Sequence, residues 1–316
     1  MKKQNPAPAN VGVDVAKSHL DIHVRPGGHE MSVSNDSLGI QQAIAFIQTH
    51  NPQRIVVEST GRYQDAFVQA CQAAQLPIVI ISTVKVRRFA YALGLLAKTD
   101  RLDAAVIAHF AEAVQPPCRS LSDETTRQIK DLIARRRQLL DMVRMEKNHR
   151  HIMPVPLQQS IAQVLECLTL QIRLVQTQLE ALICANATWQ SKQMVLLSVP
   201  GIGPVLAHTL LADLPELGQL NPKQIASLAG GAPMNQDSGQ YRGKRTIKGG
   251  RKHVRTALYM SAISAIQHNP VIAKHYRNLR TQGKHAKVAI TACMRKLIVI
   301  LNAMLKSGSP WRQQSA

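Results

Sequence analysis

Four carboxylates stand at positions where acidic side chains can bind a metal ion. Asp14 interrupts an apolar, strand-like stretch between two valines, and Glu58 directly follows the strand-like residues 54–57. A carboxylate in such a strand loses hydration and must meet a cation or hydrogen-bond donors. Asp100 and Asp103 are three residues apart, a spacing that places both on one face of a helix. The sequence therefore offers two strand carboxylates and two helical ones.

Carboxylates that converge in this way suit divalent-metal chemistry. In an RNase H-like sheet the first and fourth strands are neighbours, so Asp14 and Glu58 would lie together and the Asp100/Asp103 pair could join them. Paired cations roughly 3.5–4 Å apart stabilise the attacking and leaving oxygens of phosphoryl transfer, and Mg²⁺ suits an all-oxygen site. Each residue alone has an ordinary explanation, as a turn or cap residue or as part of a solvated helix face. Their combination with the strand order predicts a magnesium site.

A second kind of chemistry is available at Ser238. This serine follows Asp237, the last acidic residue of the chain, and precedes Gly239 and a basic cluster. A serine hydroxyl is a weak nucleophile at its ordinary pKa, but neutralising a phosphate with arginine and metal lowers the barrier to attack on phosphorus. The residues alone favour a simple turn. Tyr241 and Tyr259 are rival nucleophiles, although Tyr259 lies in an Arg/His run that also resembles a phosphate-binding helix.

Positive charge is concentrated in the C-terminal third of the chain. The formal net charge is +20, and residues 200–316 hold 17 basic but only three acidic side chains. Lysine and arginine that neutralise phosphates release counterions and give sequence-independent affinity, which favours nucleic acid as a partner. A membrane-surface segment is the alternative, less favoured because tyrosines, glycine turns and apolar helical stretches are interspersed. The candidate contacts are Arg242, Lys244, Arg245, Lys248, Arg251, Lys252 and Arg255.

The segment VPGIGPVLA at 199–207 resembles a helix-hairpin-helix turn. Gly201 and Gly203 flank one apolar residue and permit a tight hairpin. The backbone N–H groups of such a hairpin, with the N-terminus of the next helix, can face a phosphate. Glycine turns also merely join helices, but we predict non-specific DNA contact here.

The remaining pattern predicts the elements that position these residues. Apolar and polar residues alternate in three early segments, which predicts a meander of short strands. The whole order is βββ-α-β-α-β-α, which predicts a mixed sheet flanked by helices. The expected strands are 11–15, 20–24, 31–33, 54–57 and 77–81, and the expected helical stretches are 37–50, 64–75 and 87–113.

Residues 123–186 differ in character and predict two long helices broken at Pro154 and Pro156. The second helix carries apolar residues at spacings of three and four, the seam of a coiled coil or helical hairpin. We expect this segment to space domains and to pair protomers. Its basic face, Arg135, Arg136 and Arg137, is most simply a solvated helix surface, with nucleic-acid contact as the less favoured alternative. The seam residues are Leu157, Ile161, Val164, Leu168, Ile172, Val175, Leu179 and Leu182.

The predicted fold class is α/β plus α, in three domains. An RNase H-like (RuvC-like) mixed-sheet domain at 1–115 binds metal. A helical or coiled-coil connector at 120–190 leads to a mostly helical DNA-joining domain at 194–316 that carries the helix-hairpin-helix-like turn. A length of 316 residues suffices for such an arrangement.

Composition excludes several other classes of protein. The five cysteines show no CxxC and no zinc-type cluster with histidine, so neither a disulfide framework nor a zinc finger is expected. The N-terminus lacks an apolar signal region, and the longest apolar runs fall far short of a membrane span. We therefore expect a soluble, cytoplasmic protein without a membrane partner. Aromatic residues are only 3% of the chain, which weakens any model based on base stacking.

Six ordered motifs resemble one known family over nearly the whole chain. They are VGVDVAKSHLDIHV, IVVESTGRY, LAKTDRLDAAVIAHF, LLSVPGIGPVLAHTLL, IASLAGGAPMNQDSG and KGGRKHVRTALYMSA. The chain is similar to the DEDD-type insertion-sequence transposases (the IS-one-hundred-ten family), which are related to Piv-type DNA invertases and include the bridge-RNA-guided recombinases.

The resemblance implies roles for particular residues. Ser238 falls on the family's transposase-domain serine, which attacks the DNA backbone to form a phosphoserine link. Mg²⁺ is held by a RuvC-like acidic tetrad, different protomers contribute the two sites, and a structured non-coding RNA pairs with target and donor DNA. The family often has Glu before the serine where this chain has Asp237, and the residues after Gly239 are not small and polar. The tetrad falls on Asp14, Glu58, Asp100 and Asp103.

We therefore expect a transposase or site-specific DNA recombinase of an insertion sequence, acting on donor and target DNA as a dimer or tetramer with a guide RNA. One alternative is a two-metal DNA nuclease or junction resolvase that forms no covalent intermediate. The other is a non-catalytic nucleic-acid scaffold, which magnesium-dependent cleavage would exclude.

Overall fold

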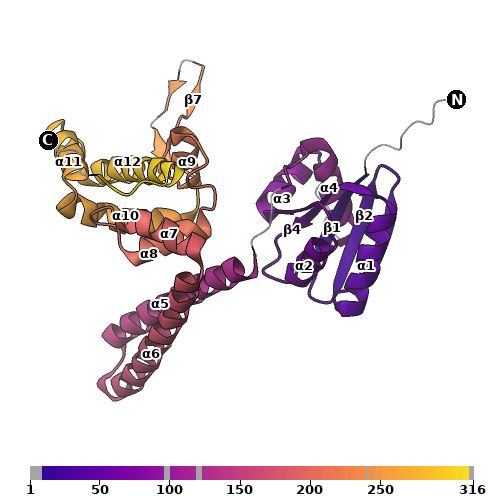
Figure 1. The fold of residues 1–316 in the computed structure, drawn as a ribbon, viewed down its shortest axis with the longest axis horizontal. Coiled ribbons are helices and arrows are strands. Elements are labelled where there is room, and N and C mark those ends of the chain that lie inside the picture. The colour runs from indigo at the N-terminus through magenta and orange to yellow at the C-terminus, as the bar shows by residue number, and fades with distance from the viewer. Residues whose placement is uncertain (1–8, 96–99, 119–122, 240, 244, 313–316) are drawn as a thin grey trace. The chain divides into compact units, whose positions relative to one another are not determined.

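The computed structural model describes residues 9–95, 100–118, 123–239, 241–243 and 245–312, with only the backbone described at 100–102 (Figure 1). The chain divides into two compact units, an N-terminal unit Met1–Leu121 and a C-terminal unit Ser122–Ala316. The contacts thus group the expected connector with the expected C-terminal domain. The division into three domains stays a prediction.

The N-terminal unit is built on one mixed sheet of five strands. Strand β1 is parallel to β4, which is parallel to β5, whereas β2 runs antiparallel to both β1 and β3. The predicted mixed α/β sheet is confirmed. The sheet order is β3-β2-β1-β4-β5, with strands β1 (Ala9–Val15), β2 (His19–Arg25), β3 (His29–Ser34), β4 (Pro52–Glu58) and β5 (Ile78–Ile81).

Helices cover both faces of this sheet. Alternate residues of β1 and β4, such as Val13 and Val57, pack with α1 (Ser37–Thr49) and α2 (Asp65–Ala73). On the other face, Val56 packs with α3 (Thr83–Ala92) and α4 (Asp100–Val114). The helical stretch expected at 87–113 is therefore two helices, and residues 96–99 between them lie outside the described part.

Close packing of α4 on β1 depends on Gly12. A Cβ at this position would overlap the backbone of Ala104 and Ala108 in α4. Glycine therefore lets the helix lie directly on the strand, which brings the first turns of α4 to the sheet face that carries Asp14.

The C-terminal unit is mostly helical, as predicted. It begins with α5 (Glu124–Ile152) and α6 (Val155–Ala185), which form an antiparallel hairpin (Figure 1). Asp123 caps α5 by accepting a hydrogen bond from the Thr126 N–H at 2.7 Å, which lowers the pKa of the Asp123 carboxyl. The remaining helices are α7 (Ala187–Leu197), α8 (Pro204–Asp213), α9 (Pro222–Leu228), α10 (Lys252–His268), α11 (Pro270–Thr281) and α12 (Ala286–Ser307).

Most of the apolar seam of α6 packs within the chain, although Leu157 and Val164 are exposed. Leu168 and Val175 are buried with Leu139 of α5, while Leu179 and Ile183 are buried in a second cluster. That second cluster also contains Trp189 of α7 and Ala212 of α8, which ties the hairpin to the other helices of the unit. The helical hairpin expected for the seam is therefore present, and a coiled coil between protomers stays a prediction.

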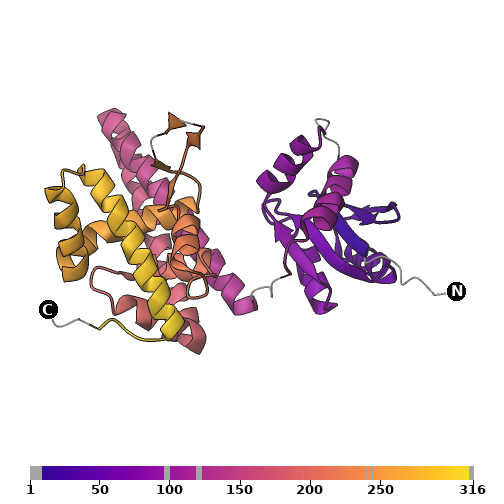
Figure 2. The ribbon, with the colours of Figure 1, turned by 90° about the horizontal axis from the view of Figure 1, so that it is seen from above.

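Helix α12 is long and apolar enough to cross a bilayer by length and composition alone. Its apolar residues Cys293, Leu297 and Leu301 are buried in the main cluster of the C-terminal unit. Figure 2 shows α12 in yellow crossing this unit, where it contacts α10 and α11. The helix thus packs as the core element of a helical domain.

Candidate active site and nucleic-acid interface

The strand register brings Asp14 and Glu58 to one end of the sheet. Val13 pairs with Val57 in the parallel β1–β4 ladder, so Asp14 and Glu58 are the next residues on two neighbouring strands. Each lies two residues after a position that faces α4. Because successive side chains alternate between sheet faces, both side chains lie on the α4 side of the sheet. Both side chains are half-buried. The predicted proximity of these two strand ends is therefore present in the backbone.

The helical carboxylates lie at the start of α4. Asp103 is half-buried and adjoins Ala104, which packs over Gly12. Asp100 begins the helix, but its side chain lies outside the described residues. Within the part of the chain that is described, no three His, Cys, Asp or Glu side chains group closely enough to hold a metal ion. Asp14 and Glu58 lie on the sheet face that α4 covers, and carboxylate oxygens fit a hard divalent cation.

Asp21 is a further carboxylate at this face that the sequence reasoning missed. It pairs directly with Asp14 across the antiparallel β1–β2 ladder, and its side chain is 14% exposed. Its Oδ2 lies 3.2 Å from Nε2 of His19. Like charges directly opposite each other are destabilising, so this end of the sheet favours a cation. The alternation of β2 was visible in the sequence, but the register that sets Asp21 beside Asp14 was not.

Ser238 lies on a short exposed hairpin of the C-terminal unit. Strand β7 (Asp237–Ser238) pairs with β8 (Tyr241–Arg242), so Ser238 stands opposite Tyr241. Gly239 begins the turn at φ +54°, where glycine is unstrained. Figure 1 shows β7 extending away from the helices of its own unit. Ser238 and Tyr241 are both exposed, so either side chain is open to a large substrate.

Strands β6 (Pro233–Met234) and β9 (Thr246–Ile247) pair below this hairpin. They join the hairpin to α9 and α10. Arg242 reaches Asp237 at 3.6 Å across the hairpin, with an Arg242 side chain that is 78% exposed. This exposed ion pair is weak, so Arg242 remains available to a phosphate near Ser238.

The helix-hairpin-helix-like turn joins α7 to α8, as predicted. Gly201 has φ +89°, and a Cβ there would lie 2.5 Å from the Ala265 Cα of α10. Gly203 has open space around it and directly precedes Pro204, the first residue of α8. Gly201 therefore serves packing, whereas Gly203 leaves the N-terminus of α8 accessible.

The basic residues after Ser238 differ in what they contact. Arg251 donates two hydrogen bonds to Glu216, at 2.6 and 2.9 Å, and Arg255 donates one to the Gly249 carbonyl at 2.6 Å. These two arginines hold the chain before α10 in place. Lys244 lies outside the described residues, while Arg245, Lys248 and Lys252 are exposed.

The three arginines of α5 also differ from one another. Arg135 is exposed, as expected of a solvated surface, but Arg136 and Arg137 are half-buried. Arg137 donates to Asp213 of α8 at 2.8 Å. The expectation of a uniformly solvated basic face was wrong for these two residues, because α8 packs against this part of α5.

An α/β unit with carboxylates at parallel strand ends, followed by a basic helical unit, fits the class of DEDD-type DNA transposases. Residues 11–153 match a family model of DEDD transposases, and residues 193–277 match the family described as "Transposase IS116/IS110/IS902 family". The chain belongs to this IS110 family of transposases, which are enzymes that cut and rejoin DNA. The DEDD domain implies an RNase H-like fold for the sheet, and such domains usually use a divalent metal.

Relatives span both invertases and insertion elements. The chain is 24% identical to the "Pilin gene-inverting protein" of Moraxella bovis over 311 residues, which covers 95% of this chain and 97% of the relative. It is 31% identical over 153 residues to the "Insertion element IS110 uncharacterized 43.6 kDa protein" of Streptomyces coelicolor, covering 48% of this chain and 36% of that protein. An uncharacterized 42 kDa protein of insertion element IS900 in Mycobacterium paratuberculosis is 31% identical over 161 residues, which cover 48% of this chain and 40% of that protein.

Proposed function

We propose that this transposase is a site-specific recombinase in which Ser238 attacks the DNA backbone while Asp14, Glu58, Asp100 and Asp103 hold Mg²⁺. The observation that carries the proposal is the pairing of Val13 with Val57, which sets Asp14 and Glu58 at neighbouring strand ends. The N-terminal unit is then an RNase H-like (RuvC-like) domain. The C-terminal unit carries the nucleophile and a helix-hairpin-helix-like DNA contact.

The reaction at Ser238 conserves phosphoester bonds. The serine oxygen forms an ester to phosphorus, one P–O bond of the DNA backbone breaks, and the departing DNA hydroxyl takes a proton. Attack of another DNA hydroxyl on the phosphoserine rejoins the strand and restores the serine. Bound Mg²⁺ would stabilise charge on the phosphate oxygens. No external energy source is needed because one phosphodiester is exchanged for another.

The same proposal includes the partners of the enzyme. A guide RNA pairing with donor and target DNA would suit a chain of net charge +20, whose C-terminal third carries most of that charge. Assembly as a dimer or tetramer would let one protomer's carboxylates act beside another protomer's Ser238, since the two groups belong to different units. We place the enzyme in the cytoplasm, where it meets DNA and RNA directly.

The test is a trapped covalent complex. The purified protein is incubated with Mg²⁺, element-end DNA and the adjacent non-coding RNA, and is then digested with nuclease for mass spectrometry. We expect a nucleotide adduct on Ser238 and loss of strand exchange in Ser238→Ala, with DNA binding retained because only one oxygen is removed. Tyr241→Phe is the control, since Tyr241 faces Ser238 in the hairpin. An adduct on Tyr241 or Tyr259 would overturn the serine mechanism.

A junction resolvase or two-metal nuclease is the alternative mechanism. It is favoured by one observation, that Asp14 and Glu58 end neighbouring strands in a unit separate from Ser238 and could act without it. Such an enzyme would cleave DNA in Mg²⁺ and leave no adduct on protein. Cleavage at the wild-type rate by Ser238→Ala would establish this alternative.

A further inference from the structure

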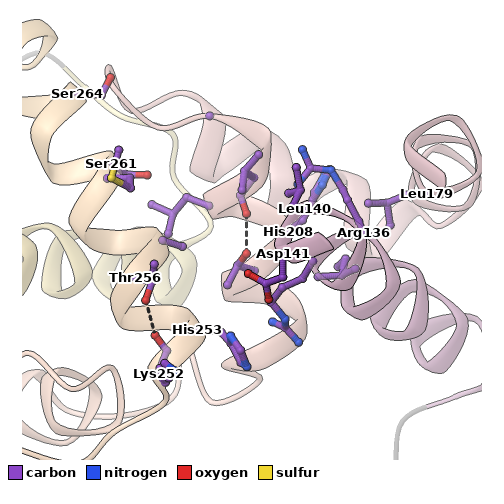
Figure 3. A pocket seen from close by; sticks show the side chains of 18 of the residues that line it. Arg136, Leu140, Asp141, Leu179, His208, Lys252, His253, Thr256, Ser261 and Ser264 are labelled. Carbon is purple, nitrogen blue, oxygen red and sulfur yellow. Dashed lines mark hydrogen bonds between the residues drawn. The ribbon is translucent and has the colours of Figure 1, made fainter. Parts of the chain in front are cut away.

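A groove of about 540 Å³ lies within the C-terminal unit between α5, α8 and α10 (Figure 3). Its walls come from segments that are far apart in the sequence. The N-terminus of α8, at Gly203, opens onto it, and the first turn of α10 supplies Lys252 and His253. The third wall is the part of α5 that carries Arg136 and Arg144.

The charge of the groove is positive. Among its described lining residues, Arg136, Arg144 and Lys252 are cations, Arg137 is a cation paired with Asp213, and Asp141 is the carboxylate. Asp141 pairs with Arg144 at 3.1 Å, but both of these side chains are more than half exposed, so solvent screens the pair. The N-terminus of α8 adds the positive end of its helix dipole and the N–H groups of its first turn. Together these groups attract an anion.

Buried polar atoms at the groove also lack partners. His208 of α8 is only 4% exposed, and in the described structure its Nε2 makes no hydrogen bond. The Nε of Arg136 is likewise buried without a hydrogen bond among the described residues. Burial, and then the nearby Arg136 cation, lowers the pKa of His208, while Glu180 opposes the shift. His208 is therefore neutral near pH 7, and its ring can donate to or accept from a bound group. Unsatisfied buried groups are costly, so these two atoms point to a ligand.

We propose that this groove binds the sugar-phosphate backbone of a nucleic-acid strand, with a phosphate at the N-terminus of α8 facing Arg136 and Arg144. Apolar side chains beside the cations, including Leu140 and Met260, offer contact to sugars. The basic face of α5 is then part of the nucleic-acid interface. This site deepens the proposed function, because a recombinase must hold a strand while it is cut, but binding alone tests it.

A charge inserted into the groove provides the first test. Thr256 lines the groove from α10 and is exposed, whereas Gln267 is exposed on the same helix outside the groove. Thr256→Glu and Gln267→Glu both lower the net charge by one. We expect Thr256→Glu to weaken binding of labelled DNA or RNA by roughly tenfold, the size of one lost backbone contact, and Gln267→Glu to change it little. Fluorescence anisotropy with the full chain measures both. Equal effects would mean that overall charge, and not the groove, governs binding.

A cation removed from α5 provides a second, independent test. Arg144→Gln removes a groove cation, and Arg135→Gln removes an exposed cation of the same helix that does not line the groove. Each lost phosphate contact lowers the slope of log affinity against log salt by about 0.9 for duplex and about 0.7 for single strands. We expect that decrease for Arg144→Gln alone. Identical slopes for the two variants would overturn the proposal.

The contribution of the neutral His208 ring to binding in the groove is tested by substitution. Glutamine keeps an amide near the ring position of Nε2, whereas leucine fills the space without a polar group. We expect His208→Gln to retain most of the affinity and His208→Leu to lose affinity several-fold. The melting temperatures of the two variants are compared first. Equal affinities for both variants would remove His208 from the site.

Parallel measurements identify the strand and separate this proposal from the mechanism. Single-stranded DNA, duplex DNA and RNA of one sequence are compared, and the strand most affected by Thr256→Glu is the occupant. Adduct formation at Ser238 is scored in the same preparations. Adducts together with unaltered binding in every groove variant would reject the groove and leave the mechanism standing. Groove-dependent binding without any adduct would support the groove and reject the serine mechanism.

Discussion

Asp14 and Asp21 face each other on adjacent strands, and Glu58 follows on the strand beyond. Three carboxylates at one end of a sheet raise the electrostatic energy of the folded chain unless cations lie among them. His19 beside Asp21 supplies part of that compensation. A divalent cation at this end of the sheet, as proposed above, would compensate these charges further.

Replacing Asp14 with asparagine should separate catalysis from stability. The change removes one proposed ligand but keeps the shape of the side chain, so strand cleavage in Mg²⁺ should be lost while the melting temperature changes little. DNA cleavage and thermal unfolding measure the two effects. Asp65→Asn is the control, because Asp65 is an exposed carboxylate of the same unit on α2. Full activity in Asp14→Asn would remove this residue from the metal site.

His208 should make the stability of the protein depend on pH. Burial lowers its folded-state pKa below the ordinary 6.5, so below that pH the unfolded chain binds more protons than the folded one. Stability should therefore be constant above pH 6.5 and fall as the pH drops from 6.5 through the folded-state pKa. Thermal unfolding at a series of pH values measures this. The decline should be shallower in His208→Gln, which cannot gain the proton, and equal declines would assign the effect to other groups.

Much of the candidate site followed from local sequence, and the rest depended on register. An Asp between valines and a Glu after an apolar run are visible without a structure. The neighbour relation of Asp14 to Asp21 was hidden because a shift of one residue in β2 would turn Asp21 to the opposite face. The pairing of Arg251 with Glu216 was hidden for a similar reason, since 35 residues separate them.

At the scale of elements, the α5–α6 hairpin combines two kinds of apolar surface. Leu168 and Val175 lie in the interface with α5 and stabilise the hairpin itself. Leu170 and Leu174, one helical turn apart, are 55% and 49% exposed. Self-association through α6 cannot use the first pair, which is already covered within the chain, whereas Leu170 and Leu174 offer an exposed apolar surface for it.

Two variants of α6 should distinguish stability from assembly. Leu168→Ala leaves a cavity beside Leu139 and should cost about 2–5 kcal/mol of unfolding free energy without changing the assembly mass. The double change Leu170→Glu and Leu174→Glu adds charge only to exposed positions, so it should leave stability nearly unchanged and lower the mass. Denaturant unfolding and light scattering measure these quantities. An unchanged mass in the double variant would show that protomers associate through another surface.

The elements themselves were predicted where their periodicity was strong. The five strands of the sheet and the break between α5 and α6 are close to the expected ranges. The pairs β6–β9 and β7–β8 were not expected, because strands of two residues carry no periodic signal and form where the surrounding chain holds them together. Ser238 lies in one of these pairs, so its exposed presentation could not be predicted.

At the scale of the whole molecule, the basic side chains after Asp237 are more numerous than the phosphates they neutralise. Sixteen Lys and Arg follow Asp237 without an acidic residue between them. Two of these, Arg251 and Arg255, are held by Glu216 and by a backbone carbonyl, and so serve the fold first. The number of phosphates neutralised is therefore smaller than the number of cations, and it can be measured from the dependence of binding on salt.

Binding of DNA or RNA to the full chain should weaken by roughly a decade or more between about 50 and 200 mM salt, because each phosphate contact releases condensed counterions. The slope of log affinity against log salt, measured by anisotropy, counts these contacts. Lys248→Gln, at an exposed position after the hairpin, removes one phosphate contact and should lower the slope by about 1. Lys192→Gln on the exposed part of α7 is the matched control and should not. A flat response to salt would mean that the positive charge of the C-terminal unit faces some partner other than a nucleic-acid backbone.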